Sequence, residues 1–153
     1  MALLITNARI VTANDDYVAD VYCESETITR IARGISSVSC ATGTEVIDAA
    51  GKFLFPGFID PHVHIYLPFM GTYAKDTWET ASRAALVGGT TTLIEMICPG
   101  KGDKPLEAFE LWLGKAQGVS ACDFSFHMGV TRWDEIAQAQ LREIVSRGVR
   151  SFK

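Results

Sequence analysis

The clearest chemical signal in the sequence is the segment DPHVH at residues 60–64, which follows the short apolar stretch at residues 57–59. Alternate side chains of a strand point to the same side, so we expect His62 and His64 to project together, with Val63 facing away. Two neutral imidazoles side by side suit zinc or a similar divalent ion. The motif alone is weak evidence, because two polar residues in a loop would give the same pattern.

A second candidate is Lys153, which ends an apolar, β-like stretch. A buried ammonium group is costly, and a nearby dication would repel it. Carboxylation by carbon dioxide would reverse its charge and provide two oxygens, one for each of two metal ions. The alternative is an ordinary exposed lysine, and the residues alone favour this alternative.

The residues alone do not decide the roles of several other side chains near these candidates. His127 lies in an apolar stretch, where a lone histidine is more often a hydrogen-bonded core residue than a ligand. Glu95 could approach the site or form a pair elsewhere, so we assign it no role. Asp60 is a candidate to orient one imidazole. The apolar segment 65–71 either lines a binding pocket or covers a rim or a subunit contact.

The predicted secondary structure that must position these residues changes near residue 56, from strands alone to strands alternating with helices. Residues 1–55 are typical of short strands separated by turns, and we expect part of a small β-sandwich domain there. In residues 56–153 strands alternate with helices, and Gly88-Gly89 ends the first helix. We expect helices at 77–87, 105–116 and 133–147, and strands at 57–60, 90–97, 122–130 and from 149 onward.

Repeated strand–helix units predict an α/β fold with a parallel sheet, either doubly wound or closed as a (β/α)8 TIM barrel. No Gly-rich phosphate loop follows the first strand, which disfavours a dinucleotide-binding sheet. A barrel usually needs about 250 residues. Residues 56–153 would therefore form the first half of a barrel, ending with its fourth strand.

Composition excludes several classes of function. The 153 residues are 48% hydrophobic and 21% charged, as in an ordinary globular protein, and the net charge of −4 disfavours nucleic-acid binding. We expect no membrane segment and no signal peptide. The four cysteines form no CxxC pair, which disfavours a disulfide framework and favours a cytoplasmic protein.

Several motifs together resemble the dihydropyrimidinase/hydantoinase family of the cyclic amidohydrolase superfamily. The segment PGFIDPHVH at 56–64 is similar to the first-strand signature of the superfamily, and LPFMGT at 67–72 resembles a loop of dihydropyrimidinases and bacterial hydantoinases. The match continues in order through AALVGGTT at 84–91, CDFSFH at 122–127 and GVRSFK at 148–153. It covers essentially the whole chain, and Phe58 departs from it, since a second glycine is common there.

The resemblance implies the first half of a TIM barrel preceded by part of a small β-sandwich domain. It implies two zinc ions, or similar divalent metals, with His62 and His64 binding one and a carboxylated Lys153 bridging both. A metal-bound hydroxide would attack a ring carbonyl of a small cyclic ureide or imide, a dihydropyrimidine or hydantoin. Leu67 and Phe69 would shape the substrate pocket, and the assembly would be a homotetramer.

The resemblance also implies that further histidine ligands, a catalytic aspartate and an oxyanion-stabilising tyrosine follow the bridging lysine. We therefore expect this segment alone to be inactive and to be part of a longer protein. Two alternatives stay open: a non-catalytic dihydropyrimidinase-like assembly or signalling protein, and an allantoinase-type hydrolase. The presence of His62, His64 and Lys153 counts against the first, and the LPF segment at 67–69 favours the dihydropyrimidinase branch over the second.

Overall fold

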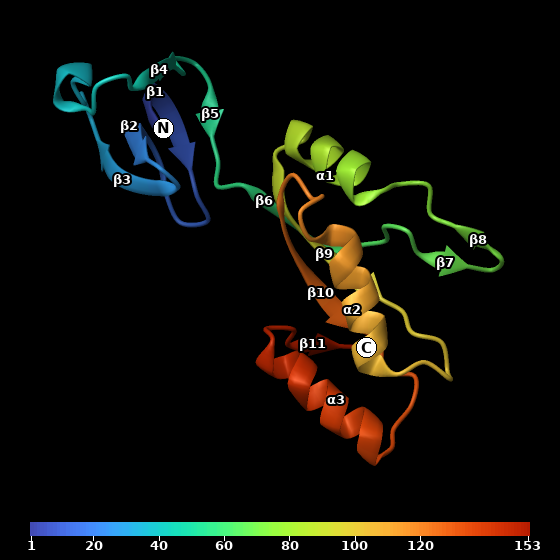
Figure 1. The fold of residues 1–153 in the computed structure, drawn as a ribbon. Coiled ribbons are helices and arrows are strands. Elements are labelled where there is room, and N and C mark those ends of the chain that lie inside the picture. Colours follow the sequence, from blue (N-terminus) through green and yellow to red (C-terminus); the bar gives the residue numbers. More distant parts are fainter. The chain divides into compact units, whose positions relative to one another are not determined.

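The computed structural model describes the backbone of residues 1–153 and every side chain except that of Phe69. The chain divides into two compact units, Met1–Pro56 and Gly57–Lys153 (Figure 1). No helix of the described residues is long and apolar enough to cross a membrane.

The unit Met1–Pro56 is built on one sheet in the order β3-β2-β1-β4, with β5 also pairing with β1. Neighbours β1, β2 and β3 run antiparallel, whereas β4 and β5 run parallel to β1. The strands are β1 (Ala2–Val11), β2 (Asp16–Glu24), β3 (Thr27–Ala32), β4 (Glu45–Asp48) and β5 (Phe53–Leu54), and one 3-10 turn spans Ser37–Ser39. Short β-rich segments between turns predicted these strands.

The core of this unit forms where alternating apolar residues of β1 and β2 meet. Ala8, Ile10 and Val21 belong to one buried cluster. The pairing of β1 with β2 shifts register between Ile5 and Ala8. Asn7, within this bulge, has a φ of 58°, a left-handed conformation that asparagine tolerates better than most residues.

The unit Gly57–Lys153 holds a four-stranded sheet in the order β11-β10-β9-β6, in which every neighbouring pair is parallel. Its strands are β6 (Phe58–Val63), β9 (Thr90–Ile97), β10 (Asp123–Met128) and β11 (Ser151–Phe152). Its helices are α1 (Trp78–Val87), α2 (Pro105–Ala116) and α3 (Glu135–Ser146). Strands β7 (Pro68–Phe69) and β8 (Thr72–Tyr73) form a separate antiparallel hairpin.

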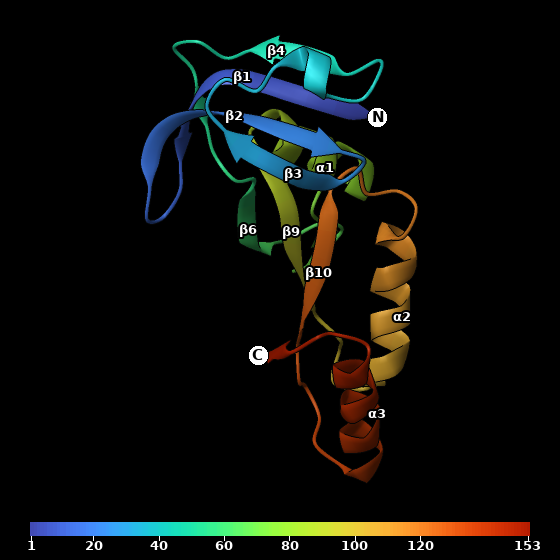
Figure 2. The same cartoon turned by 90° about the vertical axis from the view of Figure 1, so that its left-hand side faces the viewer.

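Each successive strand of this sheet is added beside the previous one, and a helix follows each of the first three. This order lacks the reversal of a doubly wound sheet, so the predicted α/β fold with a parallel sheet is confirmed and the doubly wound alternative is disfavoured. Helices α2 and α3 lie along the same side of β9 and β10 in Figure 2. Because the four strands run parallel, their carboxyl ends lie at one edge of the sheet, where ligands bind in such folds.

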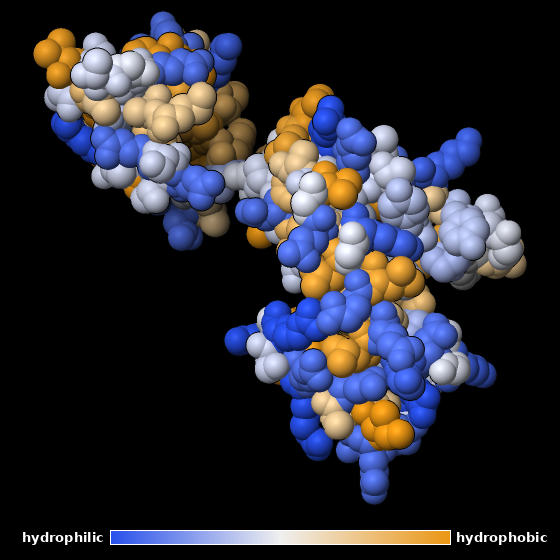
Figure 3. Space-filling model, viewed as in Figure 1, coloured by the Kyte–Doolittle hydropathy of each residue, from blue (hydrophilic) through white to orange (hydrophobic). Residues whose placement is uncertain are grey.

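The main core lies between this sheet and its helices. It joins Trp78 of α1, Phe109 of α2 and Ile144 of α3 to Leu93 and Ile97 of β9. Over α3, the surface seen in Figure 3 is mostly hydrophilic, with smaller apolar patches between polar residues. Each helix therefore buries one face in the core, and apolar side chains such as Val87, Leu111 and Ile136 stay exposed among polar ones on the other.

Several predicted bounds are corrected. The third helix begins at Glu135 rather than Trp133, because the Asp134 side chain accepts a hydrogen bond from Ala137 N–H and caps the helix. The first strand extends to Val63, so it includes His62. The β7–β8 hairpin was not predicted, since its two-residue strands are too short to show alternation.

Candidate metal centre

His62 and His64 lie side by side at the carboxyl end of β6. Their ring centroids are 4.9 Å apart and their planes meet at 87°. Val63 packs against the core on the other side, as strand alternation predicts. Asp60 Oδ1 accepts a hydrogen bond from His62 backbone N–H at 3.1 Å. The hydrogen bond of Asp60 is therefore to the backbone and not to an imidazole ring.

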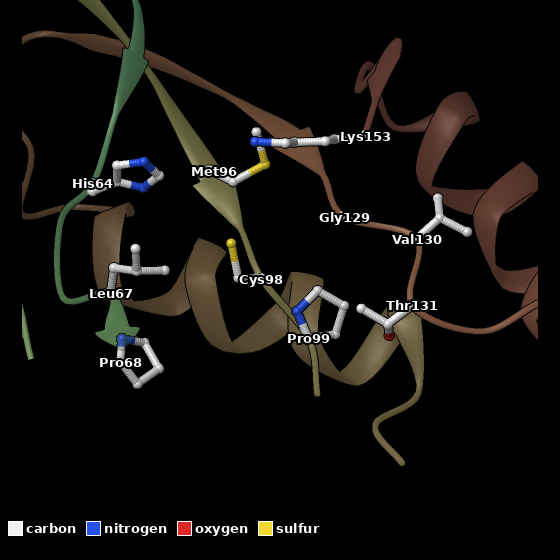
Figure 4. A pocket seen from close by; sticks show the side chains of 10 residues that line it. All are labelled: His64, Leu67, Pro68, Met96, Cys98, Pro99, Gly129, Val130, Thr131 and Lys153. Atoms are coloured by element: carbon white, nitrogen blue, oxygen red, sulfur yellow. The ribbon is translucent and has the colours of Figure 1, made fainter. Parts of the chain in front are cut away.

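Lys153 reaches the same region from the end of β11. Its backbone N–H donates to Met128 O at 3.0 Å, and its carbonyl accepts from Val130 N–H at 2.8 Å, which extends the β10–β11 ladder by one residue. Its side chain lines a cavity together with His64, and a second one together with His62. Figure 4 shows this side chain extending across the cavity toward the side that carries His64.

The electrostatic surroundings favour the neutral form of His64. Burial, followed by the proximity of His62 and of Lys153, lowers its pKa below the ordinary 6.5. No ring nitrogen of His62 or His64 forms a hydrogen bond with another described residue. Both imidazoles are therefore free to act as ligands, and for His64 the neutral form that a metal requires is favoured.

His127 holds the strand ends together instead of joining the ligands. Its Nε2 lies 2.6 Å from Pro61 O, and its Nδ1 is hydrogen-bonded to Ser151 Oγ. A carbonyl oxygen only accepts, so Nε2 carries the proton and Nδ1 accepts from the serine hydroxyl. With both ring nitrogens engaged, His127 is a structural neighbour of His62, whose ring centroid is 6.1 Å away.

A cavity of about 570 Å³ opens beside His64 and Lys153 (Figure 4). Leu67, a predicted pocket residue, lines it, whereas the side chain of Phe69 lies outside the described residues. Gly129 is required in this wall, because a Cβ there would stand 2.8 Å from Ile97 O. Pro68, from the apolar segment 65–71 that was one candidate for the pocket lining, also lines it. The remaining lining residues were not predicted and come from the ends of β9 and β10: Met96, Cys98, Pro99, Val130 and Thr131.

Glu95 is the acidic residue to which the sequence analysis assigned no role. It is completely buried in β9, and its Oε2 accepts from Ile65 N–H at 2.6 Å. Burial raises its pKa to about 7, against smaller lowering effects from Ile65, Trp112 and Lys115. In the sequence, the feature that sets Glu95 apart is its position as a carboxylate within the largely apolar and β-branched strand TTTLIEMI.

The comparison with known families adds an independent line of evidence. The model of the amidohydrolase family matches residues 45–144, about two thirds of the chain. The chain belongs to the amidohydrolase family. The matched residues include both histidines of the candidate centre but not Lys153.

The relatives that this chain resembles are considerably longer. D-hydantoinase of Geobacillus stearothermophilus is 40% identical over 154 residues, which cover 100% of this chain and 32% of that protein. Dihydropyrimidinase of Rattus norvegicus is 39% identical over 155 residues, which cover 99% of this chain and 30% of that protein. The solved structure of D-hydantoinase from Thermus sp. is 60% identical and superposes with a TM-score of 0.92, covering 98% of this chain and 32% of that one. The chain thus spans about a third of the length of these relatives.

The donor groups of this chain are compatible with a metal site. Two exposed imidazoles with free ring nitrogens suit zinc. Among the described side chains, no group of three or more His, Cys, Asp or Glu residues lies close enough to hold a metal ion. Lys153 is the further group that gathers with His62 and His64, and its ammonium form has no lone pair with which to bind a metal.

Proposed function

We propose that the protein hydrolyses the cyclic amide bond of dihydropyrimidines or hydantoins, and that this chain provides part of its metal centre. The observation that carries the proposal is that His62 and His64 lie side by side and that Lys153 lines one cavity with His64 and a second with His62. The similarity to D-hydantoinase and dihydropyrimidinase over essentially the whole chain supports the choice of substrate class. Because these relatives are about three times longer, we expect turnover from a protein that also contains the counterpart of their remaining residues.

His62 and His64 would hold one of two zinc ions, and a carboxylated Lys153 would bridge both. Such ions supply Lewis acidity and lower the pKa of water when bound. The residues of this chain prepare the site. Partial burial lowers the pKa of His64 and so favours its neutral form, and His127 fixes the carbonyl of Pro61 immediately before the first ligand.

The cavity would orient the ring and shield it from bulk water. Its volume of about 570 Å³ falls within the range of small-molecule sites. Leu67, Pro99 and Val130 offer apolar walls for a ring substituent, and Phe69 is proposed to join them. In the reaction, the oxygen of water bonds to the ring carbonyl carbon, the carbon–nitrogen bond breaks and the nitrogen gains a proton. The product is an open-chain carboxylate.

The test compares two proteins: this chain itself and a chimera in which it replaces the matching segment of the G. stearothermophilus D-hydantoinase. Ring opening of dihydrouracil, a 5-substituted hydantoin and allantoin is measured after loading with zinc and bicarbonate. We expect the chimera to open the first two rings and the chain alone to open none. His62→Ala and Lys153→Ala should reduce the chimera to background. Arg83→Ala, at an exposed ion pair on α1, is the matched control.

Other results would overturn parts of the proposal. A folded, zinc-loaded chimera that opens no ring would contradict the hydrolase and favour the non-catalytic alternative. A preference for allantoin would move the protein to the allantoinase type. Full activity of either ligand variant would remove that residue from the metal centre.

A further inference from the structure

Glu95 faces the helices, on the opposite side of the sheet from the metal cavity. Side chains alternate along β9, and Leu93 and Ile97 belong to the core between the sheet and the helices. Met96, between them, lines the cavity instead. Glu95 shares the face of Leu93 and Ile97, so its carboxylate is not placed to bind a metal ion or a substrate in that cavity.

The carboxylate nevertheless contacts the segment that carries a candidate ligand. Its Oε2 lies 2.6 Å from Ile65 N, and Ile65 directly follows His64. Ile65 is 2% exposed and belongs to the core, whereas His64 lines the cavity. The side chains of His64 and Ile65 therefore point to opposite faces of the sheet, and Glu95 holds the backbone of the residue that follows His64.

This carboxylate is an expensive choice for stability alone. It is completely buried, and its Oε1 has no hydrogen-bond partner among the described residues. The Trp112 indole N–H lies near enough to lower the pKa of Glu95 slightly, but it falls outside hydrogen-bond geometry. An apolar side chain would suit this layer better, since a buried, half-satisfied carboxylate is destabilising. Its hydrogen bond to Ile65 is the specific gain that offsets this cost.

The loop beyond Ile65 is restrained by the same group of residues. Tyr66 has a φ of 56°, a conformation that a bulky side chain rarely adopts. The Lys115 ammonium lies 5.2 Å from the Tyr66 ring centroid and 4.8 Å from that of Trp112. Tyr66 N–H also donates to Asp76 O at 3.3 Å. Such strain persists where the surroundings over-determine it.

We infer that Glu95 is a positioning residue that fixes the Ile65 backbone and thereby orients the His64 imidazole toward the metal. The inference rests on the proposed role of His64 as a ligand. Glu95 acts through Ile65 and touches no reacting group. Its replacement should therefore change metal affinity without abolishing it, as is usual for residues that support a ligand from behind.

The test uses two variants of this chain. Glu95→Leu removes the acceptor but suits the apolar layer, whereas Glu95→Gln retains a carbonyl oxygen that can accept from Ile65 N–H. Amide hydrogen exchange of Ile65 is measured by NMR in the metal-free protein. Zinc is then titrated in bicarbonate while the imidazole signals of His62 and His64 are followed.

We expect Glu95→Leu to expose the Ile65 amide to exchange and to weaken zinc binding roughly 10-fold. Glu95→Gln should keep both properties near those of the wild type. The matched control is Ser82→Ala, which removes another buried polar group, one that binds Trp78 O and Ala121 N–H. It should lower stability and leave zinc affinity unchanged.

The outcomes separate the two proposals. Unchanged zinc affinity in Glu95→Leu, together with rapid exchange at Ile65, would overturn the positioning role alone. An equal loss of affinity in Ser82→Ala would also overturn it, because general destabilisation would then explain the effect. If zinc perturbs neither imidazole of the wild-type chain, the proposed metal centre fails, and this inference fails with it.

Discussion

The Nε2 atom of His127 lies 2.6 Å from the carbonyl oxygen of Pro61, which joins β10 to β6 one residue before the first candidate ligand. The other ring nitrogen is hydrogen-bonded to Ser151 Oγ at the start of β11. One imidazole thus ties together three strands of the sheet. Lys153 lies two residues beyond Ser151, so this hydrogen bond holds the strand from which the lysine extends.

Replacing His127 by phenylalanine should loosen the centre without removing a ligand. The variant keeps a ring in the same place but loses both hydrogen bonds, so we expect zinc affinity to fall on the order of 10-fold. His62→Ala should abolish binding under the same conditions. Both are measured by zinc titration of the purified chain. Equal losses in the two variants would place His127 among the ligands and contradict the structural role.

The protonation midpoint of His64 should lie below pH 6.5. Burial first, then His62 and Lys153, lower its pKa below 6.5. The imidazole therefore remains neutral and able to bind metal at a pH where an ordinary histidine is half-protonated. Its contribution to stability is present above the unfolded pKa and is lost as pH falls through the folded pKa. NMR titration of metal-free protein measures this midpoint.

A substitution at Lys153 separates the contribution of that lysine to the lowered pKa of His64 from the contribution of burial. Lys153→Met removes one positive neighbour but leaves burial, so the midpoint should rise only part of the way toward 6.5. A wild-type midpoint at or above 6.5 would show that the pocket does not desolvate this ring.

Part of this site could be predicted because it depends on local periodicity. The pairing of His62 with His64 follows from two-residue alternation, and the parallel sheet follows from repeated strand–helix units. The approach of Lys153 depends on pairing between distant strands, so it came from the resemblance and not from the residues alone. The role of Glu95 depends on Ile65 and the α2 layer, which no local pattern reveals. The short β7–β8 hairpin likewise has too few residues for a periodic signal.

Glu95 should make the fold less stable as pH rises toward neutrality. Its pKa is raised from 4.5 to about 7 in the folded state, so the folded protein retains a proton that the unfolded chain releases. The stabilisation is full below the unfolded value and is lost as pH rises through about 7. At ~1.4 kcal/mol per pKa unit, we expect a decline on the order of 1 to 3 kcal/mol.

Glu95→Gln provides the comparison for that decline. The glutamine does not titrate, so the difference in unfolding free energy between variant and wild type should shift in favour of the variant between pH 5 and pH 8. Urea denaturation at both pH values measures the difference, in which the other titrating groups cancel. A difference that stays constant with pH would show that Glu95 titrates normally.

In the unit Met1–Pro56, Asp20 should contribute more to stability than any exposed carboxylate near it. It is 5% exposed and accepts from Asn7 N–H and Ile35 N–H, each at 2.8 Å. The Asn7 N–H is the main cause of its lowered pKa. Its stabilisation is therefore present above the unfolded pKa and is lost as pH falls through the folded one.

Asp20→Ala leaves the Asn7 and Ile35 donors without an acceptor, and we expect it to cost about 2 to 3 kcal/mol. Asp48→Ala is the matched control, because Asp48 is exposed and its Oδ1 accepts from Asn7 Nδ2 at 2.9 Å. Water can replace that hydrogen bond, so the control should cost about 1 kcal/mol or less. Urea denaturation at pH 7 compares the two variants. Equal losses would contradict the prediction, because the buried Asp20 carboxylate would then contribute no more than the exposed Asp48.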